Sequence, residues 1–291
     1  MHARPLPGRD VLVNDPSQRA LRIHVAEIGR LDTELPILLL AEPPATAYLW
    51  HAVARELGKE RRCFAPDLVG CGASERPAGR GAYAIGAQAA MLEGLLDALL
   101  DQLAVPRVAV AASGIAGAVA VALAARAPER VAALILAGSP LHADSWPTAS
   151  ALPLLPPGAG ELVLALMRVD RPHARRRLAA LLATDDGGDL EPYLDALREP
   201  GAARAALKVL RSVDMATAGA ALELVATAPP PTLVLWGESD RQLSLAYARR
   251  VADQLGARLS VILGAGHLVV RDRPQQVAAE IAGFLGPLRR P

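Results

Sequence analysis

Side chains that could take part in acid–base or nucleophilic chemistry stand directly after apolar segments of this chain. Ser113 ends the apolar run "VAVAAS", Asp240 ends "PTLVLWGESD", and His267 follows "RLSVILGAG". A serine hydroxyl becomes a strong nucleophile when a neighbouring base takes its proton. An imidazole is such a base when a carboxylate hydrogen-bonds to one ring nitrogen, because the carboxylate fixes the tautomer and favours the protonated ring. Glu42, after "PILLLA", adds a second carboxylate. These residue types can therefore support proton transfer, with or without a covalent step.

The segments that would position these residues alternate between strands and helices. Continuous apolar runs are typical of strands buried on both faces of a sheet, and the longer segments between them have helical spacing. The expected strands cover residues 19–29, 36–42, 61–68, the start of 108–131, 131–140, 231–240 and 258–267. This order predicts an α/β fold with a mostly parallel central sheet and helices on both faces.

The alternation stops at about residue 142 and resumes near residue 228. Residues 142–227 contain Pro/Gly-rich turns and several helical pieces but no clear strand. We therefore predict an α/β core formed by residues 1–141 and 228–291, with residues 142–227 inserted as a helical cap.

The composition narrows the class of protein. Hydrophobic residues make up 52% of the chain, enough for a sizeable core, and 31 Lys and Arg nearly balance 30 Asp and Glu. This balance points to no nucleic-acid or membrane partner. Cys63 and Cys71, without further Cys or His ligands nearby, favour neither zinc nor a disulfide scaffold. The N-terminal residues lack a signal-peptide pattern. We expect a cytoplasmic protein that acts on a small molecule without metal or cofactor; a homodimer stays open.

Four stretches, together and in this order, resemble the α/β-hydrolase superfamily. The resemblance is to its cap-bearing branch of small-molecule esterases, epoxide hydrolases, dehalogenases and C–C hydrolases, and it spans roughly residues 20 to 287 apart from the cap. The stretches are "LLLAEPPATAYLW", "FAPDLVGCGASERP", "VAVAASGIAGAVAVALAARAPERVAALILAGSP" and "PTLVLWGESD…GAGHLVVRDRPQQV". The resemblance implies that Asp240 stands at the family's catalytic acid and His267 at its base.

The family's nucleophile position falls on a glycine in this chain. The family pattern is a strand, Gly-x-Ser-x-Gly-Gly, a helix and then "PERV"; counting from either side puts the serine's place on Gly114. Glycine takes the backbone angles of this tight turn without Cβ strain. The neighbouring Ser113 is the alternative nucleophile, but "AASGI" lacks both flanking glycines, and a slip of one residue turns the side chain away from the tip of the turn.

The loop that follows residues 36–42 also departs from the family. Where the family usually reads "LHGxP", this chain has Ala41, Glu42 and Pro43. Pro43 falls where a backbone N–H would help to form the oxyanion hole, and proline has no N–H. Loss of one oxyanion donor is worth about 2.7–4 kcal/mol. The second expected donor is the N–H of Ile115. Glu42 is either an acid partner of His267, a carboxylate that binds a cationic substrate group, or a solvated or ion-paired loop residue.

Several other residues are candidates for the walls of a pocket. Ser139 and His142 follow the strand 131–140, at the end where parallel sheets bind ligands. Tyr48, Trp146 and Tyr193 are candidate apolar walls. The basic run "RPHARRRL" (171–178) is either a solvated helix face or a group that steers an anionic substrate.

These observations leave three functional hypotheses. The first is an enzyme of α/β-hydrolase fold that lacks the serine nucleophile and uses His267, oriented by Asp240, as a general base on a small, largely apolar substrate. Its reaction would be direct hydrolysis, or elimination, isomerisation or cyclisation. The second is a non-catalytic protein that binds a small ligand. The third is a serine esterase that uses Ser113.

Overall fold

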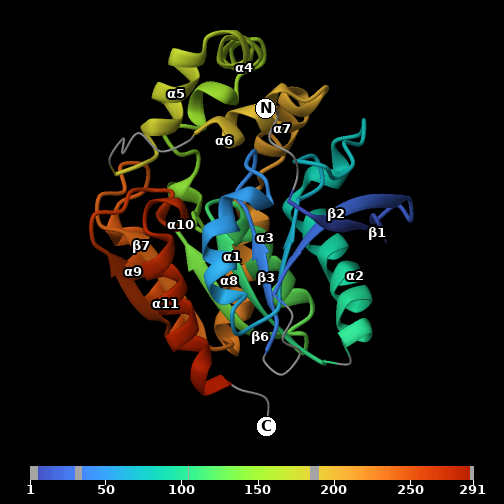
Figure 1. The fold of residues 1–291 in the computed structure, drawn as a ribbon, viewed down its shortest axis with the longest axis vertical. Coiled ribbons are helices and arrows are strands. Elements are labelled where there is room, and N and C mark those ends of the chain that lie inside the picture. Colours follow the sequence, from blue (N-terminus) through green and yellow to red (C-terminus); the bar gives the residue numbers. More distant parts are fainter. Residues whose placement is uncertain (1–5, 30–34, 104, 184–189, 289–291) are drawn as a thin grey trace.

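The computed structural model describes residues 6–29, 35–103, 105–183 and 190–288. Over these residues the chain forms one eight-stranded sheet with helices on both faces (Figure 1). The strands are β1 (Gly8–Asn14), β2 (Ala20–Ile28), β3 (Ile37–Leu40), β4 (Cys63–Pro66), β5 (Val108–Ser113), β6 (Val131–Ala137), β7 (Thr232–Gly237) and β8 (Arg258–Ile262). The α-helices are α1 (His51–Leu57), α2 (Ile85–Leu103), α3 (Ala116–Arg126), α4 (Ala159–Val169), α5 (Arg171–Ala179), α6 (Glu191–Asp195), α7 (Ala202–Leu210), α8 (Met215–Thr227), α9 (Leu245–Leu255), α10 (Val269–Asp272) and α11 (Pro274–Leu285).

The sheet confirms the predicted α/β class. Its strand order is β1-β2-β4-β3-β5-β6-β7-β8. The pairs β1–β2 and β2–β4 are antiparallel, and the other neighbouring pairs are parallel. β1 was not expected from the sequence, because most of its side chains are exposed and no apolar run marks it. A 3₁₀ turn, Ala47–Trp50, leads directly into α1.

Two apolar layers hold the sheet between its helices. Alternate residues of β5 face opposite sides, as in any strand. Val108 and Val110 pack in the layer that contains residues of α2, α3, α8 and α9, while Ala109 and Ala111 pack in the layer with α1, α10 and α11. Burial on both faces explains why the central strands are continuous apolar runs.

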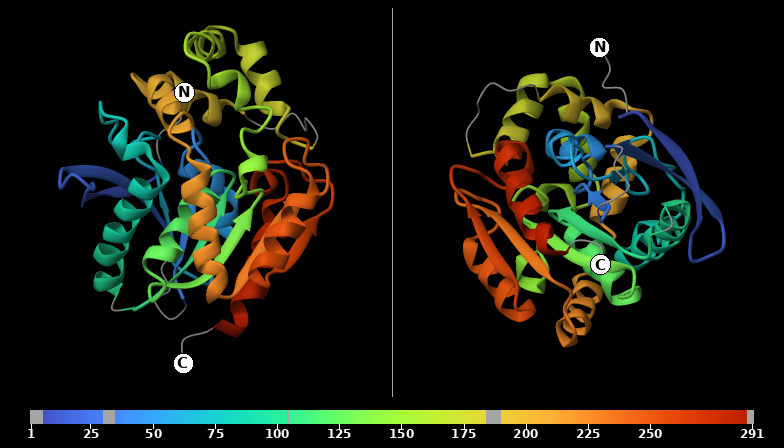
Figure 2. Two further views of the ribbon diagram at one scale, coloured as in Figure 1. Left: turned by 180° about the vertical axis from the view of Figure 1, so that it is seen from behind. Right: turned by 60° about the horizontal axis from the view of Figure 1, so that its bottom comes forward.

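The described residues between 142 and 227 form helices and turns, without a strand. The helices α4 to α7, which we call the upper helices, lie at one end of the sheet (Figures 1 and 2). Two of them, α4 and α7, form a small apolar cluster with the 3₁₀ turns Leu152–Leu154 and Ala196–Arg198: Leu154, Leu164, Leu197, Ala206, Leu207 and Leu210. The last helix of the range, α8, packs instead beside α3 on the sheet. Among the described helices, none is long and apolar enough to cross a membrane.

Candidate active site

The turns that follow four parallel strands meet beneath the upper helices. Glu42 follows β3, Gly114 follows β5, Asp240 follows β7 and His267 follows β8. The carboxyl ends of parallel strands share one edge of a sheet, so residues far apart in sequence become neighbours there. Open parallel sheets commonly bind ligands at this edge.

Gly114 occupies the sharp turn between β5 and α3. Its φ is +51°, in the left-handed region that favours glycine. A Cβ atom at this position would overlap the carboxylate of Glu42: the Glu42 Cδ would lie only 2.5 Å away and its Cβ 2.8 Å away. The Glu42 carboxylate therefore fills the space into which any side chain at position 114 would project.

His267 lies between two carboxylates. Its Nδ1 is 2.9 Å from Oδ2 of Asp240, and its Nε2 is 3.5 Å from Oε2 of Glu42. The side chains of His267 and Asp240 are 3% and 1% exposed, whereas that of Glu42 is 18% exposed. Glu42 is thus the member of the three that is most open to the space above the sheet edge.

Neighbouring backbone groups hold Asp240 and His267 in place. The Oδ1 of Asp240 accepts hydrogen bonds from the backbone N–H groups of Gln242 (2.7 Å) and Leu243 (3.0 Å). Gly138 approaches the ring closely, because a Cβ there would lie 3.6 Å from His267 Nδ1 and 3.2 Å from its carbonyl oxygen. These contacts fix the direction of the Asp240 carboxylate toward the imidazole.

Burial and charge act in opposite directions on the two groups that face each other. Burial lowers the pKa of His267, but the carboxylates of Glu42 and Asp240 outweigh it, so this pKa lies above its usual value. Burial also raises the pKa of Glu42, against the opposing effect of the His267 charge. The Glu42 carboxyl also lies beside the N-terminus of α3, which favours a negative charge. The charges of the two groups thus act on each other across the 3.5 Å between Nε2 and Oε2.

The other residues proposed around the turn have different surroundings. Ser113 is 4% exposed, and its Oγ accepts the backbone N–H of Glu42 at 3.2 Å. Pro43 and Ile115 line the cavity described below, whereas Ser113 is not among its described lining residues. The Ser113 hydroxyl thus supports the Glu42 loop.

Among the described residues, Ser139 and His142 form no hydrogen bond with the acid–base residues around His267. Ser139 is buried and packs against Gly117 of α3, where a Cβ on the glycine would overlap the serine side chain. The Nε2 of His142 is 3.0 Å from Oε1 of Gln254. Neither residue is among the described residues that line the cavity.

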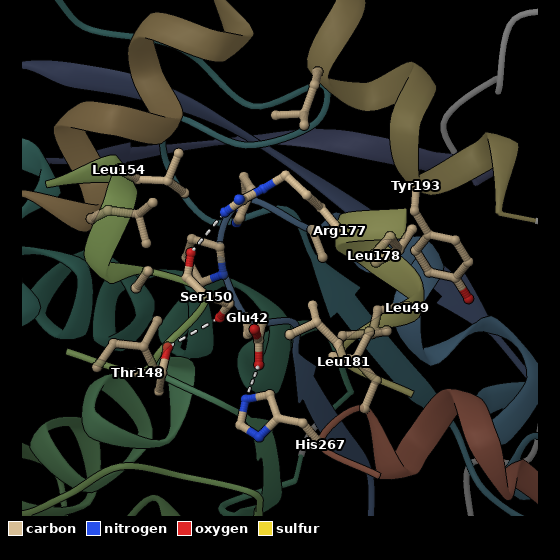
Figure 3. Close-up of a pocket in the computed structure, with 18 of the residues that line it drawn as sticks. Glu42, Leu49, Thr148, Ser150, Leu154, Arg177, Leu178, Leu181, Tyr193 and His267 are labelled. Carbon is tan, nitrogen blue, oxygen red and sulfur yellow. Dashed lines mark hydrogen bonds and ion pairs between the residues drawn. The ribbon is translucent and has the colours of Figure 1, made fainter. Parts of the chain in front are cut away.

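A cavity of about 140 Å³ lies between the sheet edge and the upper helices. Figure 3 shows Glu42 and His267 on one side of it and Arg177, Leu178 and Tyr193 on another. Most of the lining is apolar, and it includes the expected wall residues Trp146 and Tyr193. The lining residues are Glu42, Pro43, Pro44, Ala45, Leu49, Ile115, Pro140, Trp146, Thr148, Ser150, Ala151, Leu154, Leu164, Met167, Arg177, Leu178, Leu181, Tyr193, Leu194, Leu197, Leu210, His267 and Leu268.

Three polar lining residues, Thr148, Ser150 and Arg177, were not singled out from the sequence. Arg177 belongs to the basic run 171–178, where the neighbouring arginines gave the same signal. Tyr48, expected as a wall, is absent from the described lining; its ring stacks on His51 at 4.1 Å and meets the edge of Tyr193 at 5.5 Å.

Comparison with known proteins shows the family to which this chain belongs. The model of the alpha/beta hydrolase fold family matches residues 40–274. The 2-hydroxymuconate semialdehyde hydrolase of Pseudomonas sp. (strain CF600) is 31% identical over 260 residues, which cover 86% of each chain. A thermophilic esterase from Thermogutta terrifontis has a TM-score of 0.78 at 23% identity, with coverage of 97% of this chain and 100% of that one. The 2-hydroxy-6-oxo-6-phenylhexa-2,4-dienoate hydrolase of Rhodococcus sp. strain RHA1 has a TM-score of 0.74 at 20% identity, with coverage of 96% and 100%. At these identities the two solved structures show a common fold. The chain belongs to the α/β-hydrolase family.

Proposed function

We propose that this protein is an enzyme that transfers a proton through Glu42, His267 and Asp240, without a serine nucleophile. One observation carries the proposal: the Glu42 carboxylate fills the space beside Gly114 and faces His267 Nε2 at 3.5 Å. In a serine hydrolase the nucleophile hydroxyl stands in contact with this imidazole nitrogen. Here the group in that place is a carboxyl, so an acyl-enzyme on serine is not expected.

Each of the three residues has a distinct task in this mechanism. Asp240 accepts the hydrogen bond from Nδ1 of His267, which leaves Nε2 as the nitrogen that exchanges a proton. Glu42 and His267 both line the cavity, and the Glu42 side chain is the more exposed of the two. A proton taken from substrate or water passes to Glu42 or, through the shared pair, to His267. The reverse transfer then completes the cycle.

The lining of the cavity sets the class of reaction and substrate. Most lining residues are aliphatic, so the substrate is a small, largely apolar molecule. The absent N–H at Pro43 weakens oxyanion stabilisation, whereas the N-terminus of α3 at Ile115 retains donors that favour a developing negative charge. This combination supports attack by activated water, or elimination, isomerisation or cyclisation by proton transfer.

The first test uses 2-hydroxymuconate semialdehyde, the compound in the name of the relative from Pseudomonas. NMR in deuterated water follows both its cleavage and its uptake of deuterium, so hydrolysis and proton transfer are both detected. We expect His267→Ala and Glu42→Gln to slow the wild-type reaction by about 10²-fold or more, the usual range for a general acid–base group. Ser113→Ala serves as the control and should stay within about twofold.

A fluorophosphonate probe provides the second readout, because it labels activated serines irrespective of substrate. We expect no label on the wild-type protein. Label on Ser113, or loss of turnover in Ser113→Ala, would overturn the proposal in favour of a serine esterase. Absence of wild-type turnover, combined with ligand binding that is unchanged in His267→Ala, would instead favour a non-catalytic binding protein.

A further inference from the structure

We propose that Arg177 binds the carboxylate of the substrate, and that the substrates are therefore small apolar carboxylic acids. The inference rests on the proposed function in one respect, since it takes the cavity above His267 as the substrate site. It adds Arg177 as the group that binds the substrate carboxylate, and so defines the substrates as carboxylic acids.

The direction of Arg177 follows from its place on α5. Ala174, which is fully buried, and the lining residues Leu178 and Leu181 mark the inner face of this segment. Residues three apart share a helix face, so Arg177 lies on the face of α5 that carries Ala174, and Leu181 lies in the turn that follows this helix. Figure 3 shows its side chain extending across the cavity toward Ser150.

The other arginines of α5 point elsewhere. Arg171 and Arg175 are 59% and 39% exposed and lie 2.9 Å and 3.6 Å from carboxylate oxygens of Glu191. Arg176 is exposed. Among the described residues of the basic run 171–178, Arg177 is the arginine that lines the cavity.

Hydrogen bonds connect Arg177 to the core. Its Nη2 donates to the carbonyl oxygen of Ser150 at 3.3 Å, and the Ser150 N–H donates to Oε1 of Gln242 at 2.8 Å. The Gln242 N–H in turn donates to Asp240 at 2.7 Å. The guanidinium is thus connected by successive hydrogen bonds to the same loop that orients His267.

The chemistry of the cavity selects one kind of ligand. A guanidinium has five N–H donors in a planar fork that matches a carboxylate, and the long bond to Ser150 uses one of them. Among the described lining residues, Arg177 is the only Arg or Lys. A single positive charge balances a carboxylate, whereas a dianionic phosphate would keep an uncompensated charge in apolar surroundings.

The two ends of the cavity then orient the bound acid. Glu42 would repel a carboxylate, and Arg177 would attract it. The apolar body of the acid lies along the leucines between them, so the end opposite the carboxylate meets Glu42 and His267. The cavity of about 140 Å³ is close in volume to a cavity of about 150 Å³ that holds benzene.

The experiment measures binding of unreactive ligands by calorimetry. The probes are butanoate, hexanoate and octanoate, each compared with its primary amide, and hexyl phosphate. The variants are Arg177→Met, Arg177→Lys and the matched control Arg176→Met, which removes the adjacent but exposed charge. Thermal unfolding of each variant checks that it is folded.

We expect the wild type to bind at least one acid about tenfold or more tightly than its amide, and to bind hexyl phosphate no better than the amides. Arg177→Met should remove that preference, Arg177→Lys should restore part of it, and Arg176→Met should leave it unchanged. Equal binding of acid and amide, absence of binding by every acid, or an equal loss in Arg176→Met would overturn the inference.

Ligand binding tests the carboxylate subsite, and turnover tests the proposed catalytic function, so the two ideas can fail separately. In His267→Ala the acid preference should persist although turnover is lost. If the preference holds while wild-type turnover is absent, the carboxylate subsite stands and the catalytic proposal fails. If turnover depends on His267 but acids and amides bind alike, the catalytic proposal stands and the subsite fails.

Discussion

At the scale of single residues, Gly114 and Glu42 have to be considered together. Position 114 has no side chain, and a carboxyl from a loop 72 positions earlier fills the space that a side chain would need. Either feature alone would be unfavourable, since an empty space would lose packing contacts and an added side chain would collide with Glu42. The two residues are therefore a compensating pair.

Restoring serine at position 114 tests this pairing. Gly114→Ser introduces a Cβ that overlaps Glu42 at a left-handed φ, so we expect a loss of about 1–3 kcal/mol in the free energy of unfolding and no fluorophosphonate label. The double variant Glu42→Gly/Gly114→Ser removes the collision. Urea unfolding should then show a favourable coupling of about 0.5–3 kcal/mol between the two sites. Simple addition of the two single effects would mean that the residues are independent.

The sequence predicted some of these residue-scale features and not others. The resemblance to the α/β hydrolases implied that Asp240 and His267 are partners, and the two side chains are in hydrogen-bond contact. The sequence left the place of Glu42 open among three alternatives, since a loop residue's direction depends on packing that periodicity does not encode. Arg177 was missed as an individual residue because three neighbouring arginines gave the same signal. The catalytic roles of all four residues stay predictions.

At the scale of elements, the upper helices are connected to one another by a few charged contacts. Arg211, which caps α7, donates to both carboxylate oxygens of Glu161 in the first turn of α4, at 2.7 Å and 2.9 Å. The same guanidinium donates to the carbonyl oxygens of Leu155 and Pro156. Arg211 thus joins the end of one helix to the start of another, and the position of α4 over the cavity depends on it.

This contact predicts a pH dependence of stability with a definite sign. The hydrogen bonds from Arg211 lower the pKa of Glu161 from 4.5 to about 2. A carboxyl whose pKa is lowered by folding stabilises the protein above its unfolded pKa, and that contribution is lost as the pH falls through the folded value. The difference in unfolding free energy between wild type and Glu161→Gln should therefore be present at pH 7 and disappear between about pH 5 and pH 2.

Urea unfolding at a series of pH values measures this difference, and Arg211→Met provides the control. In the Arg211→Met background, Glu161→Gln should make a much smaller pH-dependent difference, because only the backbone N–H groups of Gly158 and Glu161 then lower the pKa of Glu161. An undiminished pH-dependent difference there would mean that Arg211 is not the main cause of the lowered pKa.

At the scale of the whole molecule, the cavity lies between the packed sheet and a much smaller apolar cluster above it. The sheet has an apolar layer on each face, whereas α4 and α7 share a small cluster in which Leu164 is 2% exposed. Small clusters bury less apolar surface and open more readily than the main core. The sequence predicted the helical insertion from the break in strand alternation, but the packing of α8 against α3 depends on tertiary contacts that the break does not reveal.

Hydrogen exchange should therefore distinguish the upper helices from the sheet. Leu164→Ala removes a buried side chain from the small cluster, a change that typically destabilises by about 2–5 kcal/mol. We expect the amides of α4 and α7 to exchange about tenfold or more faster, while those of β5 and β6 keep their wild-type rates. Leu134→Ala, in β6 and fully buried, is the matched control and should speed exchange throughout the sheet. Equal acceleration of both regions in Leu164→Ala would mean that the upper helices and the sheet unfold as one unit, and substrate entry could then not proceed by opening of the upper helices alone.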